Sequence, residues 1–84
     1  MKKETLEDFR NRIDVCDRKI AVLLSQRLET AREIGQSGLK SHVCDPDRER
    51  QVICNVRKAS SPEFACFIEE IFKEIIRQSR KVQE

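Results

Sequence analysis

The chain has 84 residues, 38% hydrophobic and 38% charged, which suits one folded helical domain rather than a disordered protein. Only two glycines and two prolines occur, which leaves little material for turns. The formal net charge is +2, and four phenylalanines are the only aromatic residues apart from one histidine, so the sequence offers neither the basic surface nor the stacking platform of a nucleic-acid-binding protein. We predict a single all-α domain over residues 1–84.

The first segment, MKKETLEDF, interrupts its apolar residues with acidic ones and so has no signal-peptide core. No later run is long and apolar enough to span a membrane, so we expect a cytoplasmic protein without membrane contact. The four cysteines show no paired zinc-type spacing, and a reducing compartment argues against disulfides. We expect no metal site, and we expect Cys16 and Cys54 to be buried as small hydrophobic residues.

The first predicted element is a long helix that begins at Leu6, with Thr5 as its cap and stop signals at residues 35–38. Steps of three and four residues connect a heptad seam: Leu6, Phe9, Ile13, Cys16, Ile20, Leu23, Arg27, Thr30 and Ile34. A helix of roughly 30 residues is about 45 Å long, whereas a compact chain of this size has a radius of gyration of about 12 Å. The helix must overhang a monomeric core, which predicts a homodimer.

Two shorter helices follow. The second is predicted from Pro46 to about Lys58, with Asp45 as its N-cap. The third is predicted from Pro62, capped by Ser61, to near the C-terminus. Its broad apolar face consists of Phe64, Phe67, Ile68, Ile71, Phe72, Ile75 and Ile76.

Polar side chains fall on these apolar faces. Glu49 precedes Val52 and Ile53 by three and four residues, so its carboxylate shares their side of the second helix. The polar positions on or beside apolar faces come from all three predicted helices: Arg10, Arg27, Glu49, Ser79 and Gln83. A buried charge without a partner costs several kcal/mol, so these charges need compensation.

Two explanations remain open from spacing alone. Arg27 could form a structural ion pair with Glu49, or its aliphatic stem could lie on the apolar face while its guanidinium group reaches solvent. Alternatively, the interior is a polar pocket for a small hydroxylated dicarboxylate, held by guanidinium groups and by Glu49. No nucleophile with an adjacent base accompanies the set, so covalent or hydrolytic chemistry is not expected.

Four motifs in order resemble the all-helical class of chorismate mutases over nearly the whole chain. They are R-x-x-I-D-x-x-D at residues 10–17, the arginine at 27, D-x-x-R-E at residues 45–49 and the glutamine at 83. The resemblance implies an intertwined three-helix homodimer with two active sites. It also implies conversion of chorismate to prephenate, without a cofactor, on the shikimate route to phenylalanine and tyrosine.

The resemblance also implies the residues that bind the substrate: Arg10, Arg27, Asp45, Arg48, Glu49, Ser79 and Gln83. Arg27 and Ser79 would hold a carboxylate, as would Arg10, which would reach across from the other subunit. Arg48 would add positive charge, and Glu49 would bind the ring hydroxyl with help from the backbone near Asp45. Gln83 would donate to the ether oxygen of the breaking bond.

One position departs from this pattern. The family usually has a second ether-oxygen donor, a lysine, where this chain has Gly38, and the following loop, LKSHVC, is about two residues shorter than usual. Continued helix would turn Lys40 about 200° away from that lysine's direction. If Gly38 ends the helix instead, Lys40 is free to return to the pocket, and we hypothesise that it partly replaces the lysine.

Two alternatives to the mutase stay open. A related lyase that removes pyruvate from isochorismate would share the fold and the arginines. A mutase-like regulatory subunit, acting on a partner enzyme of the pathway, would keep the pocket without catalysis.

Overall fold

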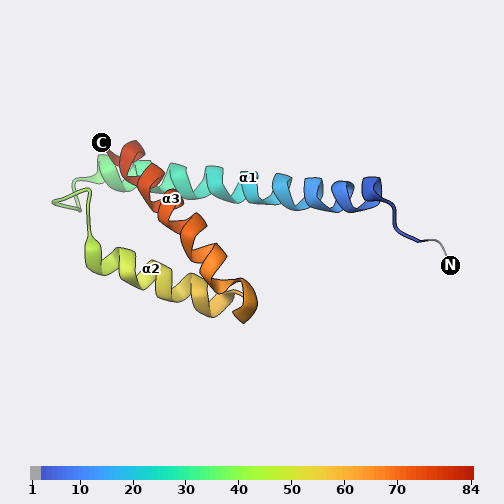
Figure 1. The fold of residues 1–84 in the computed structure, drawn as a ribbon. Helices are drawn as coiled ribbons and strands as arrows, with labels where there is room; N and C mark the ends of the chain where they lie inside the picture. The colour runs from blue at the N-terminus through green and yellow to red at the C-terminus, as the bar shows by residue number, and fades with distance from the viewer. Residues whose placement is uncertain (1–2) are drawn as a thin grey trace.

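The computed structural model describes residues 3–84, and all of their regular secondary structure is helical. Its elements are α1 (Leu6–Ser37), α2 (Pro46–Ala59), the 3₁₀ turn η1 (Pro62–Phe64) and α3 (Ala65–Gln83) (Figure 1). The predicted all-helical class with three helices is confirmed. Residues 1 and 2 of the predicted domain lie outside the described part.

Both ends of α1 follow from local chemistry. Thr5 Oγ1 accepts a hydrogen bond from the Asp8 N–H at 3.1 Å, and the Asp8 carboxylate accepts one from the Thr5 N–H at 2.9 Å, which completes a capping box. The helix ends after Ser37 because Gly38 has a φ of 72°, in the left-handed region that glycine adopts without strain. The predicted cap and the predicted stop are therefore confirmed.

The second helix also starts as predicted, since Asp45 Oδ1 accepts a hydrogen bond from the Arg48 N–H at 3.1 Å and Pro46 stands in the first turn. The prediction for the third helix is wrong at its start. Pro62 opens a 3₁₀ turn, and Ser61 makes no side-chain capping bond. Phe64, with φ −107° and ψ −2°, departs from α-helical geometry, so α3 begins only at Ala65.

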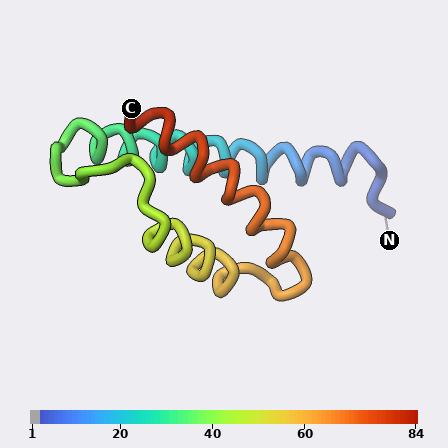
Figure 2. Tube along the Cα trace, turned by 60° about the vertical axis from the view of Figure 1, so that its left-hand side comes forward, coloured from blue at the N-terminus to red at the C-terminus, as the bar shows by residue number. Residues whose placement is uncertain are grey.

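The helix α3 is the central element, because it packs against both α1 and α2 (Figures 1 and 2). Its C-terminal end meets the C-terminal end of α1 at Gly35. A Cβ atom on Gly35 would lie 2.5 Å from the Gln83 carbonyl oxygen, so only glycine permits this approach. The described residues with the lowest exposure belong to these two packed helices, α1 and α3: Ala31, Ala65, Ile76 and Ser79.

The N-terminal half of α1 extends away from the other helices in both views (Figures 1 and 2). Its seam residues are open to solvent, with Phe9 48% and Ile13 59% exposed. The radius of gyration is 16.4 Å, compared with about 12 Å for a compact chain of this length. The overhang predicted from the seam is therefore present.

The four cysteines are free and exposed, so the prediction that Cys16 and Cys54 are buried is wrong for the single chain. Cys16 lies in the overhanging part of the seam, where no other segment of residues 3–84 covers it. Among residues 3–84, no helix has both the length and the apolar character needed to cross a bilayer.

Candidate functional site

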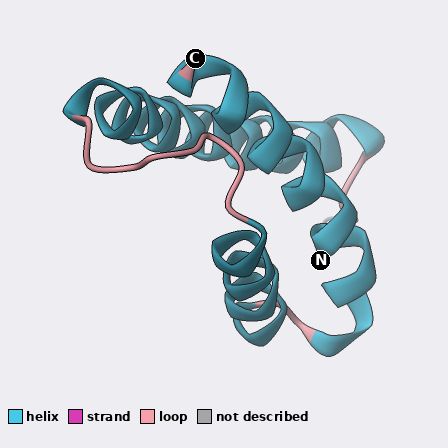
Figure 3. Ribbon diagram, turned by 90° about the vertical axis from the view of Figure 1, so that its left-hand side faces the viewer, coloured by secondary structure: helices cyan, strands magenta, loops and turns pink. Residues whose placement is uncertain are grey.

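A cavity of about 590 Å³ lies where the C-terminal part of α1, the loop after it, the start of α2 and the end of α3 meet. This volume is typical of small-molecule sites. Figure 3 shows the loop between α1 and α2 passing beside the C-terminal part of α3. Seven of the predicted site residues line the cavity: Arg27, Lys40, Asp45, Arg48, Glu49, Ser79 and Gln83.

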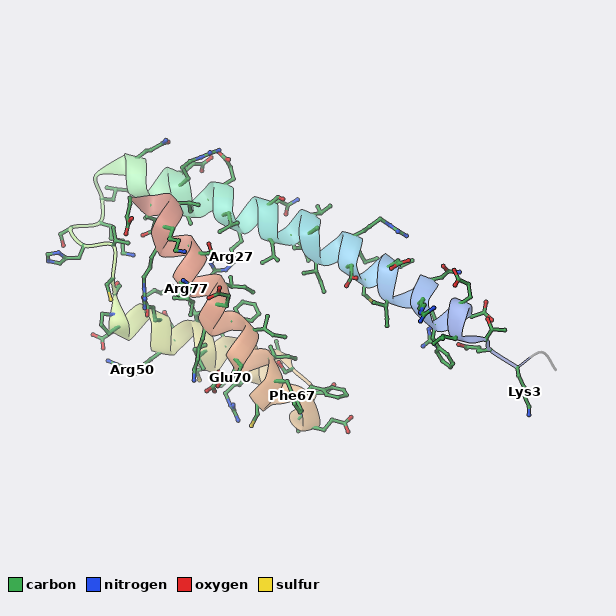
Figure 4. All side chains as sticks on the ribbon, turned by 45° about the horizontal axis from the view of Figure 1, so that its top comes forward. Lys3, Arg27, Arg50, Phe67, Glu70 and Arg77 are labelled. Atoms are coloured by element: carbon green, nitrogen blue, oxygen red, sulfur yellow. The ribbon has the colours of Figure 1, made fainter. Side chains whose placement is uncertain are left out.

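The Arg27 side chain points from α1 toward α3 (Figure 4). Its Nη1 donates to Ser79 Oγ at 2.5 Å, and Ser79 Oγ donates onward to the Ile75 carbonyl oxygen at 2.8 Å. Burial lowers the pKa of Arg27, and the positive charge of Arg48 lowers it further. The guanidinium group is therefore held in place by a neutral partner and repelled by a neighbouring cation.

Glu49 is paired with Arg80, a residue that the sequence reasoning missed. Arg80 Nε donates to Glu49 Oε2 at 2.8 Å, and Arg80 Nη2 donates to the other carboxylate oxygen. The structural ion pair between Arg27 and Glu49, one of the open explanations, is therefore wrong. A signal for Arg80 was available, because it follows Ile76 by four residues and precedes Gln83 by three, which puts all three on one side of α3.

The pKa of Glu49 is lowered, chiefly by the hydrogen bonds from Arg80, while partial burial acts in the opposite direction. The carboxylate is therefore ionised near neutral pH and acts only as a hydrogen-bond acceptor. That is the form required to accept a hydrogen bond from a ligand hydroxyl.

Lys40 lies at the other end of the cavity. Its Nζ donates to the Val43 carbonyl oxygen at 2.8 Å and to Gln83 Oε1 at 3.1 Å. Because α1 ends before Gly38, Lys40 is not held in the outward helical direction. The structure thus brings Lys40 beside Gln83, as hypothesised, although this contact does not test a role in catalysis.

The positive charge in the cavity is not balanced. Arg48 Nη1 donates to Gln51 Oε1 at 2.7 Å, so Arg27, Lys40 and Arg48 all bond to neutral oxygens. Within residues 3–84, only Arg80 among the cavity cations forms a salt bridge. Four cations and two carboxylates line the cavity, so it suits a ligand with two negative charges.

Arg10 is the predicted site residue that the chain does not bring to the cavity. It precedes Arg27 by 17 positions on the same helix, which corresponds to about 26 Å along the axis. A single chain cannot close that distance, because both residues belong to one continuous helix. Its arrival from a second subunit stays a prediction.

Comparison with known proteins assigns the chain to a family. The family model described as chorismate mutase type II matches residues 9–84, a range that includes all eight predicted site residues. Searches of curated proteins and of solved structures found no match.

Proposed function

The chain belongs to the chorismate mutase type II family, and on that premise we propose that it rearranges chorismate to prephenate without a cofactor. We place this reaction in the cytoplasm, on the route to phenylalanine and tyrosine. The observation that carries the proposal is the set of three cavity cations, Arg27, Lys40 and Arg48, whose hydrogen-bond partners within residues 3–84 are all neutral oxygens. Chorismate carries two carboxylates, which would balance this charge.

Binding of the carboxylates falls to the guanidinium groups. Arg27 would form a bidentate pair with one carboxylate, and Ser79, already bonded to Arg27, lies beside it. Arg48 adds positive charge from α2. The repulsion from Arg48 that lowers the pKa of Arg27 would be relieved when an anion binds between them.

The rearrangement breaks a C–O bond and forms a C–C bond within one molecule, so it needs no nucleophile or general base. A pocket accelerates it by holding the substrate in a compact conformer and by donating hydrogen bonds to the ether oxygen, where negative charge develops. Gln83 Oε1 accepts from Lys40, which leaves the Gln83 amide N–H groups free to donate. We assign the donation to Gln83 and Lys40, and the recognition of the ring hydroxyl to Glu49 with the backbone near Asp45.

A homodimer is part of the proposal. The chain exposes 7124 Å², whereas a compact 9.9 kDa monomer exposes about 5,200 Å². The excess, about 1,900 Å², is large enough for one side of an obligate interface. A second copy with its α1 on this seam would bury apolar residues such as Phe9 and Ile13, and would bring its Arg10 to the cavity.

Incubation of the purified protein with chorismate, followed by product identification, tests the proposal. We expect loss of chorismate with formation of an equal amount of prephenate. Release of pyruvate from isochorismate, without prephenate from chorismate, would favour the lyase instead. Binding of chorismate without turnover would favour a regulatory subunit.

A further inference from the structure

Most ion pairs among residues 3–84 join residues three or four apart on one helix, such as Arg50 with Asp47, and their side chains are largely exposed. Two pairs join α2 to α3, and Arg57 with Glu69 is the one whose residues do not line the first cavity. The Arg80 pair joins α3 to α2 across 31 residues and lies in the cavity wall, with side-chain exposures of 37% and 23%.

We propose that Arg80 is a positioning residue for Glu49. It holds the Glu49 carboxylate toward the hydroxyl group of the substrate and away from the cations that bind the carboxylates of the substrate. This inference rests on the proposed function. Arg80 itself need not touch the substrate.

The hydrogen bonds leave Glu49 able to accept more. An ionised carboxylate has about four acceptor sites on its two oxygens, and Arg80 takes one on each oxygen through Nε and Nη2. The remaining sites can accept a hydroxyl proton. A bidentate pair also fixes the plane of the carboxylate, which a single hydrogen bond does not.

The pair also keeps Glu49 away from other partners. The charged groups that line the cavity with it are Arg27 from α1, Lys40 and Asp45 from the loop, Arg48 from α2 and Arg80 from α3. The positive charge of Lys40 acts on Glu49 already. Without Arg80, the carboxylate would be free to pair with Lys40, which would withdraw this ammonium group from the ether oxygen.

A second cavity of about 830 Å³, between α2 and α3, shares Glu49, Ile76 and Arg80 with the first. The Arg80 pair therefore forms part of the wall between the two cavities. Its loss would open the site toward the second cavity, so water would compete for the Glu49 carboxylate.

The test uses Arg80→Met, which keeps the length of the side chain and removes its charge and donors. The matched control is Arg77→Met, because Arg77 pairs with Glu74 on the same helix and lines the second cavity but not the first. In the substrate-free protein, carbon NMR of the Glu49 carboxyl group should show its pKa rising toward the ordinary value in Arg80→Met and unchanged in Arg77→Met.

With chorismate, Arg80→Met should lower kcat/KM by about tenfold or more, because a small misplacement of a binding group has large effects on rate. The acid limb of the pH profile should move to higher pH. Arg80→Lys keeps the charge but not the bidentate geometry, so it should restore the charge effect on the Glu49 titration and only part of the rate.

An unchanged Glu49 titration and pH profile in Arg80→Met would overturn the proposal. If Arg80→Met does not fold, Arg80→Lys decides, and a wild-type rate and profile in that variant would overturn the role of the bidentate geometry. If the wild-type protein makes no prephenate, the proposed function fails. The substrate-free titration then still decides whether Arg80 holds Glu49.

Discussion

The two halves of α1 share one helix and one heptad seam, yet they have opposite surroundings. Every residue from position 6 to position 22 is exposed, whereas the C-terminal half packs on α3 and buries Ala31 to 6% exposure. One uninterrupted helix runs from the capping box at Thr5 to the stop at Gly38. The difference therefore lies in the presence of a partner: α3 covers one half, and no segment within residues 3–84 covers the other.

Each half carries one of the predicted carboxylate-binding arginines. Arg27 reaches the cavity from the packed half, while Arg10 lies on the overhang. If a second copy covers the overhang, the unpacked half has a function, which is to complete the site of the other subunit. The predictions that follow test the halves separately.

The largest effect is expected in the packed half. Arg27→Ala should lower kcat/KM by about 10² to 10³, with little loss of stability, because it removes a charge that has no carboxylate partner in the substrate-free protein. Steady-state kinetics and thermal melts measure both effects. The control is Arg32→Ala, which should retain wild-type kinetics. Arg32 is exposed and pairs with Glu29 in the same half of α1. Loss of folding in Arg27→Ala that matches its loss of activity would contradict the binding role.

A slightly smaller effect is expected in the overhanging half. Ile13→Glu places a charge in the seam, so it should convert a dimer into a monomer and reduce activity by about 10² through loss of the partner's arginine. Asn11→Glu adds the same charge outside the seam and should remain a dimer. Analytical ultracentrifugation beside kinetics separates the two variants. If the wild-type chain is a well-folded monomer at micromolar concentration, the prediction that two subunits share each site is wrong.

The loop that follows the packed half gives the next prediction. Lys40→Ala removes the donor that contacts Gln83 Oε1, and kcat should fall at least about tenfold with folding unchanged. Lys58→Ala, on the last turn of α2, is the control. A wild-type rate would eliminate Lys40 and leave Gln83 as the principal donor. In that case Gly38→Lys is informative, because a gain in kcat would show that the pocket lacks a cation.

The smallest effect is expected from an exposed pair on α3. Hydrogen bonds from Arg77 lower the pKa of Glu74 from the ordinary 4.5 to about 2. A lowered folded-state pKa gives stability that is present above the unfolded pKa and lost as the pH falls through the folded value. Glu74→Gln should therefore melt slightly lower than the wild type at pH 7, and the difference should vanish near pH 2. An exposed pair of this kind contributes little, so a large difference would contradict its description as a surface pair.

Local signals in the sequence predicted the helices well. The capping box at Thr5, the cap at Asp45 and the stop at Gly38 each involve residues within one turn of each other, so the sequence contains the whole interaction. The start of α3 was predicted wrongly because Ser61 and Pro62 resemble a cap, while residues 62–64 form a 3₁₀ turn before the α-helix begins.

The sequence predicted which residues line the site better than it predicted which of them pair with each other. The resemblance named six residues that do line the cavity, the departure at Gly38 pointed to a seventh, Lys40, and periodicity placed Glu49 on the inner side of α2. The partner of Glu49 could not be chosen from spacing, because Arg27 and Arg80 both face the cavity and only the crossing of α3 over α2 selects between them. The same limit applies to Cys16, whose burial depends on a partner that the chain alone does not supply.

The most direct test of the shared site is a mixture of two inactive variants, Arg10→Ala and Arg27→Ala, in one dimer. In a two-fold dimer where each site takes Arg27 from one copy and Arg10 from the other, the mixed dimer contains one intact site. Each variant alone should be nearly inactive, and random mixing should restore about a quarter of wild-type activity. Mixed dimers that are no more active than either variant alone would show that Arg10 does not complete the site of its partner.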